Sequence, residues 1–164
     1  MKRRNFIKFS ATLAFLFSSN VAIARTISKE KLVILDEIFN IIFPKTSTMP
    51  SAKEFKALNY LVQNISHKNF DDDDKVLIVD GTKDFSESFP EFLTLKDEEK
   101  KELIFRIIKS SSYAKSWISK LTYYGIEAIF SDPIYGGNFE QIGWNSVKHN
   151  IGYPRPLKTY GQKI

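Results

Sequence analysis

The sequence predicts an all-α protein, with a small domain of about four to six helices over residues 25–130. Apolar residues in this range recur at three- and four-residue steps, the spacing of one helix face. No pair of alternating apolar runs flanks an Asn-Gly or Asp-Gly dipeptide, so no hairpin is expected. Five of the seven glycines and three of the six prolines follow Phe130. Residues 131–164 are therefore expected to form a long irregular arm of the same domain, rich in glycine, proline and aromatic residues.

Two amphipathic helices are expected in the first part of the domain. The first covers Ser28 to Phe43, with Ser28 as a suitable N-cap and Pro44 as the residue that stops it. The second begins after Ser51. The side chains expected to face the core are Leu32, Leu35, Ile38, Phe39 and Ile42 in the first helix, and Phe55, Leu58, Leu61, Val62 and Ile65 in the second.

Four consecutive aspartates, Asp71 to Asp74, have two interpretations. They suit an acidic metal site, or they begin a helix, where carboxylates meet the positive end of the helix dipole. Calcium loops alternate their ligands with other residues and include a glycine for the turn. Neither feature is present, so the helix start is favoured. Val76 to Val79 then suits a short strand or a helical turn, and Gly81 is expected to end it.

The middle of the chain predicts two more helices. Leu95 to Ile108 has a clear apolar face, and Tyr113 to Phe130 follows a serine-rich break at 110–112 that supplies an N-cap. The aromatic residues of the second helix are expected in a core or an interface rather than around a cofactor. An aromatic-rich connection around Pro90 precedes both helices and contains Phe85, Phe89, Phe92 and Leu95.

The first 24 residues have the form of a twin-arginine export signal. Two adjacent arginines, an aromatic residue and a lysine precede an apolar run that is shorter and more polar than the about 20 residues of a membrane span. Ala22 and Ala24 give the small-x-small form of a cleavage site, so cleavage is expected after Ala24. A Sec signal that happens to carry two arginines is the alternative. The residues expected to carry the export signal are Arg3, Arg4, Phe6 and Lys8.

This signal predicts a periplasmic protein that meets the twin-arginine translocase. The route transports folded proteins, so a small protein needs it when it carries a cofactor or is bound to a protein that does. Four of the 24 basic residues lie in the signal, which leaves 20 basic and 19 acidic residues, a net charge of +1. The high pI of the whole chain is therefore no indication of nucleic-acid binding.

The chain after the signal offers little chemistry of its own. It has no cysteine, which excludes disulfides, thiolate metal sites and covalent haem attachment. No phosphate-binding glycine motif and no nucleophile elbow occurs. The two histidines, His67 and His149, are too few and too far apart for a persuasive metal centre. No catalytic, cofactor-binding or metal-binding residue is therefore expected, and the protein is not expected to be an enzyme by itself.

The strongest motif begins directly after the aromatic helix and reads Asp-Pro-Ile-Tyr-Gly-Gly-Asn from Asp132 to Asn138. Proline stops the helix, the two glycines permit positive φ, and Asn138 can cap local amides. Tyrosine and tryptophan held on a rigid turn suit a buried contact with another protein, although a turn that serves only its own fold is the alternative. The residues expected to contact a partner are Asp132, Pro133, Tyr135, Gly136, Gly137, Asn138, Gly143, Trp144, Tyr153 and Pro154.

These segments resemble the gluconate 2-dehydrogenase subunit 3 family, the small (gamma) subunits of membrane-bound FAD-dependent dehydrogenases. The resemblance spans signal to tail and is most specific in the final third of the chain. Phe43 stands where the family's early Ile-Ile-Pro has a second isoleucine. The segments that carry it are Ile42-Phe43-Pro44, Asp132 to Asn138, Gly143-Trp144 and Gly152-Tyr153-Pro154.

The resemblance implies an accessory subunit of a three-part enzyme. A large flavoprotein with FAD oxidises a sugar or sugar acid, and a multihaem cytochrome c subunit with haem c passes the electrons to quinone. The small subunit carries the export signal for the flavoprotein and stays bound to it at the inner membrane. The alternative function is an independent periplasmic sugar-binding or interaction protein that uses the aromatic tail as a stacking surface.

Overall fold

The computed structural model describes residues 27–150, and within this range it contains α-helices and short 3-10 helices but no strand. The all-α prediction is confirmed. Among these residues, no helix has the length and apolar character that a membrane span requires. The α-helices of this range are α2 (Lys29–Ile42), α3 (Ala57–Ile65), α4 (Asp72–Ser88), α5 (Asp97–Ser110), α6 (Ser112–Phe130) and α7 (Ile142–Ser146).

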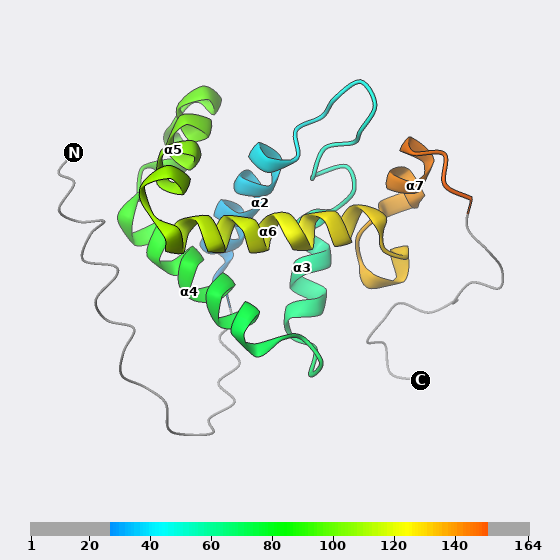
Figure 1. Cartoon of the computed structure of the whole chain (residues 1–164), viewed down its shortest axis with the longest axis horizontal. Helices are drawn as coiled ribbons and strands as arrows, with labels where there is room; N and C mark the ends of the chain where they lie inside the picture. Colours follow the sequence, from blue (N-terminus) through cyan, green and yellow to red (C-terminus); the bar gives the residue numbers. More distant parts are fainter. Residues whose placement is uncertain (1–26, 151–164) are drawn as a thin grey trace.

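Helix α6 is the centre of the domain. It runs across the molecule in Figure 1, with α4 and α5 toward its first residues and α7 at its last, and it contacts α2, α3, α4, α5 and α7. Its inner side alternates large and small residues: Trp117 and Leu121 fill the core, while Gly125 leaves space for the Phe43 ring. A Cβ at position 125 would overlap that ring. The core therefore depends on a close approach of α2 to α6.

The sequence predicted that this segment ends at Gly81, but helix α4 continues to Ser88. Of the two possibilities for Val76 to Val79, a strand or a helical turn, the helix is observed. Gly81 is buried, and a Cβ placed there would lie 2.5 Å from Cδ1 of Trp117. The glycine thus permits the indole ring of α6 to pack directly on the backbone of α4. It marks a close helix contact and not a helix end.

The phenylalanine-rich connection is part of the core. Phe85 lies in α4 and Phe92 in the 3-10 helix η2 (Phe92–Thr94), and both are buried. The Phe85 ring centroid lies 5.3 Å from that of Trp117, 4.9 Å from Phe92 and 5.2 Å from Phe89. These distances are in the range of favourable aromatic pairs. The cluster holds the α4–α5 connection against α6.

Local capping explains where several helices begin. The Ser111 side chain accepts a hydrogen bond from the Ala114 N–H at 3.2 Å and starts α6, as predicted. Asp71 accepts from the Asp74 N–H at 2.9 Å and starts α4, so the helix-start interpretation of the aspartates is confirmed. Ser28 stands at the N-cap position of α2, but its side chain makes no capping hydrogen bond.

The second predicted helix differs from expectation in where it begins and at one core position. Phe55 is fully buried but precedes the first residue of α3, while Val62 is 40% exposed on the outer side of that helix. The apolar spacing of this segment therefore belongs to a turn followed by a nine-residue helix. The prediction of a single amphipathic helix from residue 52 onward was therefore wrong.

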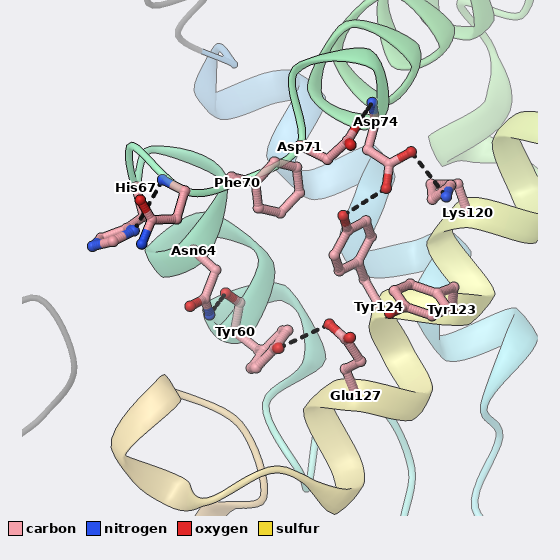
Figure 2. A pocket seen from close by; sticks show the side chains of 11 residues that line it. Tyr60, Asn64, His67, Phe70, Asp71, Asp74, Lys120, Tyr123, Tyr124 and Glu127 are labelled. Carbon is pink, nitrogen blue, oxygen red and sulfur yellow. Dashed lines mark hydrogen bonds and ion pairs between the residues drawn. The ribbon is translucent and has the colours of Figure 1, made fainter.

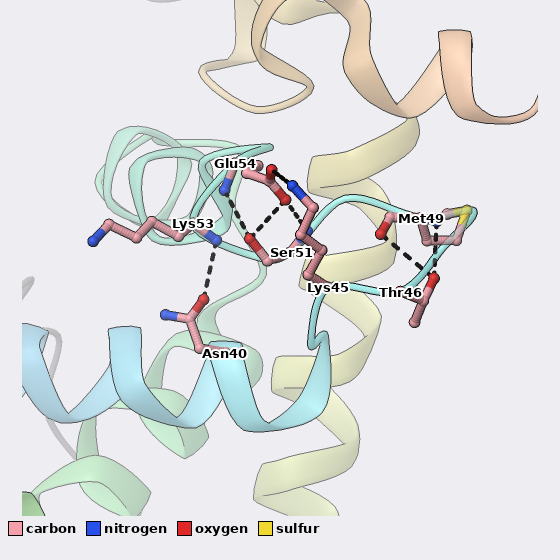
Figure 3. Close-up of polar contacts among 7 residues, drawn as sticks. All are labelled: Asn40, Lys45, Thr46, Met49, Ser51, Lys53 and Glu54. Carbon is pink, nitrogen blue, oxygen red and sulfur yellow. Dashed lines mark hydrogen bonds and ion pairs between the residues drawn. The ribbon is translucent and has the colours of Figure 1, made fainter. Parts of the chain in front are cut away.

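The loop between α2 and α3 is fixed by its own polar side chains (Figure 3). The Thr46 hydroxyl oxygen accepts from the Met49 N–H at 2.9 Å. The Glu54 carboxylate accepts from the N–H and hydroxyl of Ser51 at 2.8 and 3.0 Å and pairs with Lys45. These hydrogen bonds, led by the one from Lys45, lower the pKa of Glu54 to about 2. The loop is thus ordered without a core of its own.

Candidate partner-binding site

Residues 131–150 fold back on the helical domain. This segment contains η3 (Pro133–Tyr135), η4 (Phe139–Gln141) and α7, and it lies against the end of α6 and beside α3 (Figure 1). An irregular arm was expected here because glycine and proline are concentrated after Phe130. The described part instead contains two 3-10 helices and a five-residue α-helix, which are short enough to lie between the glycines.

The first half of the motif makes the turn that the sequence predicted. Helix α6 ends at Phe130, and the Asp132 carboxylate accepts from the Ile134 N–H at 3.0 Å. Pro133 is the first residue of η3, a position whose backbone N–H would have no hydrogen-bond partner within the helix, so the missing N–H of proline costs nothing there. Gly136 has a φ of 92°, in the left-handed region that glycine adopts without cost.

Gly137 and Gly143 have a different role from the one expected. The sequence analysis attributed positive φ to Gly137, but among the glycines of the described range only Gly136 has it. A Cβ at Gly137 would overlap the Ala128 carbonyl oxygen, and one at Gly143 would overlap the Ile129 carbonyl oxygen. Both glycines therefore allow the returning chain to touch the backbone of α6.

The Asn138 side chain fixes the position of the chain where it folds back onto α6. It is fully buried, with a φ of 44°, and its amide nitrogen donates to the Ser131 carbonyl at 2.9 Å. Its amide oxygen accepts from the Gly143 N–H at 2.8 Å. The prediction that Asn138 caps local amides is confirmed, and the side chain ties the end of α6 to the start of α7.

Trp144 also faces inward. It is 8% exposed, and its indole N–H donates to the Phe130 carbonyl at 2.7 Å, one of the carbonyls left unpaired at the end of α6. The tryptophan that the sequence offered as a partner anchor therefore has a complete role within its own domain. A contact of this motif with a partner stays a prediction, and Tyr153, Pro154, Arg3, Arg4, Phe6, Lys8, Ala22 and Ala24 lie outside the described residues.

Three amide side chains of α3 hold the turn from the other side. Asn59 donates to the Gly136 carbonyl at 2.6 Å, Gln63 to the Ile134 carbonyl at 3.1 Å, and Asn64 to the Tyr135 carbonyl at 2.9 Å. The sequence analysis missed these residues. Their spacing of four and five positions on one helix was the available signal, but nothing local pointed to a partner more than 70 residues later.

A pocket of about 530 Å³ opens on the face of the domain between α3, the start of α4 and α6. Figure 2 shows aromatic rings and carboxylates from these three elements pointing toward the same space. Its volume falls within the range of ordinary ligand pockets. Its lining residues are Tyr60, Asn64, His67, Asn69, Phe70, Asp71, Asp74, Lys120, Tyr123, Tyr124 and Glu127.

Tyrosine hydroxyls and carboxylates alternate around the pocket. The Tyr124 hydroxyl donates to Asp74 at 2.7 Å, and Lys120 lies 2.8 Å from the other oxygen of that carboxylate. The Tyr60 hydroxyl donates to Glu127 at 3.0 Å. Burial first, and then the adjacent carboxylate, raise the pKa of both Tyr60 and Tyr124. A hydrogen bond to Glu127 raises the pKa of Tyr123. The pocket is thus lined by tyrosine hydroxyls bonded to carboxylates from α4 and α6.

An apolar stripe borders the pocket on α6, and we define it as Tyr123, Ile126 and Phe130. These side chains are 51%, 49% and 41% exposed, and their spacing of three and four residues places them on one helix face. The sequence analysis assigned the aromatic residues of this helix to a core or an interface. The helical spacing of these three residues, compared with that of the buried Trp117, Leu121 and Tyr124, would have separated the two sides.

The residues that the structure describes contain no group of three or more histidine, cysteine or acidic side chains arranged to hold a metal ion. The aspartate run of α4 is instead used by its own domain. Asp71 caps the helix, and Asp74 bonds Tyr124 and Lys120. This face therefore presents charged groups, aromatic rings and hydrogen-bonding side chains.

The described range is thus a small helical domain, with Gly137 and Gly143 buried and one polar, aromatic face open. The family model for gluconate 2-dehydrogenase subunit 3 matches residues 29–150, which is most of the chain. The protein belongs to this family, and it is therefore an accessory subunit of the gluconate 2-dehydrogenase type, whose name implies association with other subunits of a dehydrogenase. No curated protein and no solved structure matches the chain.

Proposed function

We propose that this protein is the non-catalytic small subunit of a periplasmic, FAD-dependent gluconate 2-dehydrogenase-like complex. It binds the flavoprotein subunit, accompanies it through the twin-arginine translocase and stabilises it afterwards. Membership of the subunit 3 family over residues 29–150 is the observation that carries the proposal. FAD belongs to the flavoprotein, and haem c to a cytochrome subunit that connects the complex to the inner membrane.

The sequence supports this division of labour. The chain begins with the residues of a signal for folded proteins, yet it has no cysteine and no nucleotide-binding glycine motif. A signal of this kind on a chain without such features is explained if the cofactor belongs to a bound partner. One export signal then serves two proteins.

The export part is tested by the double substitution Arg3→Lys and Arg4→Lys. We expect the flavoprotein to remain in the cytoplasm, because it depends on a signal carried by this chain. A matched control is Lys29→Arg with Lys31→Arg, which changes basic residues outside the signal. Flavoprotein that reaches the periplasm in full without the twin arginines would refute the escort function.

The alternative function, an independent sugar-binding protein, now has one specific observation in its favour. The pocket combines tyrosine rings with hydrogen-bonding groups, which is a suitable lining for a neutral sugar, although its carboxylates would repel a sugar acid. Calorimetry on the isolated chain with glucose separates the two functions. Specific sugar binding in the absence of any flavoprotein would favour the alternative.

A further inference from the structure

The pocket between α3, α4 and α6 lies beside the apolar stripe, whose three side chains are 41–51% exposed. We propose that it receives a basic side chain, lysine or arginine, of the flavoprotein subunit, while the stripe packs against the residues around that side chain. The proposal rests on the proposed function and adds the surface and the chemistry of the contact.

The charges of the pocket are unbalanced. Three carboxylates line it, those of Asp71, Asp74 and Glu127, against the ammonium group of Lys120. Lys120 pairs with Asp74, and Asp71 caps its own helix beside the positive end of the α4 dipole. Glu127 accepts from the Tyr60 hydroxyl and is hydrogen-bonded to Tyr123, but no cation pairs with it in residues 27–150. Glu127 is therefore the carboxylate that an incoming cation would neutralise.

The aromatic rings favour the same kind of group. A cation within about 6 Å of a ring centroid is attracted by the negative face of the ring. The ammonium group of Lys120 already uses this chemistry, at 5.3 Å from the Tyr123 ring centroid and in contact with Asp74. A second cation at Glu127 would lie in an equivalent environment of tyrosine and carboxylate, between Tyr60 and Tyr123 (Figure 2).

The apolar stripe indicates that the cation belongs to a protein. Ile126 and Phe130 continue from Tyr123 along the exposed side of α6, and a small ligand in the pocket would leave them in water. Protein interfaces concentrate their binding energy in such groups, with tyrosine and arginine enriched at the centre. A free sugar acid fits less well, because its carboxylate would meet the unbalanced negative charge.

The test uses the full chain, with an affinity tag after Ile164, co-expressed with its flavin dehydrogenase. The complex is purified in rising sodium chloride, and the FAD absorbance per chain is measured. Glu127→Gln keeps an acceptor for Tyr60 but removes the charge, so we expect at least tenfold weaker retention and a shallower salt dependence. Tyr123→Ala should weaken retention by a similar factor.

Two matched controls carry the same chemical changes on α5. Glu102→Gln removes an exposed carboxylate, and Phe105→Ala removes a ring that is 62% exposed. Neither should alter retention or its salt dependence. Circular dichroism of all four variants shows whether a loss of binding comes from a loss of fold. A structural role of Glu127 predicts that Glu127→Gln loses helical signal, whereas the proposal predicts an unchanged spectrum.

The outcomes distinguish a failure of the pocket contact from a failure of the proposed subunit function. If the unaltered chain retains no flavoprotein, the proposed function fails and this inference fails with it. If the unaltered chain retains it and Glu127→Gln does so equally, the subunit function stands and the pocket contact is overturned. Calorimetry with glucose adds a third arm: binding that Glu127→Gln abolishes would make the pocket a sugar site and would also overturn the proposal.

Discussion

Trp144 in residues 131–150 and the aromatic residues on the outer side of α6 differ in their surroundings. In the first region Trp144 and Asn138 are buried and bonded to the end of α6. In the second, Tyr123, Ile126 and Phe130 are about half exposed beside a pocket in which Glu127 bonds tyrosine hydroxyls but pairs with no cation of the described residues. Several motif residues therefore have a role inside the domain, and their contact with a partner stays a prediction, while the outer side of α6 presents half-exposed side chains at the surface.

This difference teaches how the glycine-rich motif should be interpreted. Gly137 and Gly143 are required because the chain touches the backbone of α6, and Gly136 because φ is positive. These are demands of the turn itself, and they hold whether or not a partner is present. An interface requires accessible groups, and the outer side of α6 offers three of them in a row, Tyr123, Ile126 and Phe130.

The largest expected effect is that of Trp144→Ala on stability. The substitution removes a buried ring and leaves the Phe130 carbonyl without its donor, so the free energy of unfolding should fall by about 3–5 kcal/mol. Urea denaturation of the chain measures it. Phe105→Ala is the control and should change stability by less than about 0.5 kcal/mol, because that ring is exposed. Equal effects would break the distinction between the two regions.

Gly143→Ala should have the next largest effect. The added methyl group would overlap the Ile129 carbonyl oxygen, which is backbone and cannot rotate away, so we expect a loss of about 1–3 kcal/mol. Asn145→Ala, at an exposed position two residues further, is the control. A fully stable Gly143→Ala variant would mean that α7 does not approach α6 as closely as described.

Tyr124→Phe tests the inner wall of the pocket and has a pH signature. Its hydroxyl donates to Asp74, so removing it should cost about 1 kcal/mol at pH 7. The pKa of Tyr124 is raised in the folded state, so its contribution is complete below about pH 10 and is lost as pH rises toward the folded pKa. The unaltered chain should therefore lose more stability than the variant between pH 9 and pH 11, measured as Tm. Parallel pH profiles would contradict this assignment.

Glu54→Gln, in the loop between α2 and α3, should have the smallest effect. The pKa of Glu54 is lowered to about 2 by Lys45 and Ser51, so its contribution exists above the unfolded pKa and is lost as pH falls. The variant should show a smaller decrease of Tm between pH 6 and pH 3 than the unaltered chain, with no change in flavoprotein retention. An unchanged acid profile would mean that the loop hydrogen bonds do not persist in solution.

Local signals predicted much of the fold. The helices that became α2, α5 and α6 were found because their apolar period is long, and Ser111 because a cap acts within three residues. The prediction of a helix end at Gly81 was wrong because the glycine makes room for Trp117, which lies 36 positions later on another helix. The packing of residues 131–150 was missed because Asn59, Gln63 and Asn64 bond carbonyls more than 70 positions away.

The candidate site was less accessible to sequence reasoning for the same physical reason. The aspartate run pointed correctly to a helix start, but nothing in it indicated that Asp74 would bond Tyr124 from another helix. Glu127 is one of 19 acidic residues, and only its position opposite Tyr60 distinguishes it. The pocket forms only where three elements pack together, and the sequence of each element alone predicts an ordinary amphipathic helix.

The most direct measurement of the central claim is the effect of Ile126→Asp on flavoprotein retention and on Tm. Val33→Asp is the matched control, since Val33 is 51% and Ile126 is 49% exposed on different helices. The account predicts that Ile126→Asp reduces retained FAD per chain at least tenfold with a Tm close to that of the unaltered chain, whereas Val33→Asp changes neither. Full retention by Ile126→Asp, or an equal loss with Val33→Asp, would contradict the claim that the open face of α6 holds the partner.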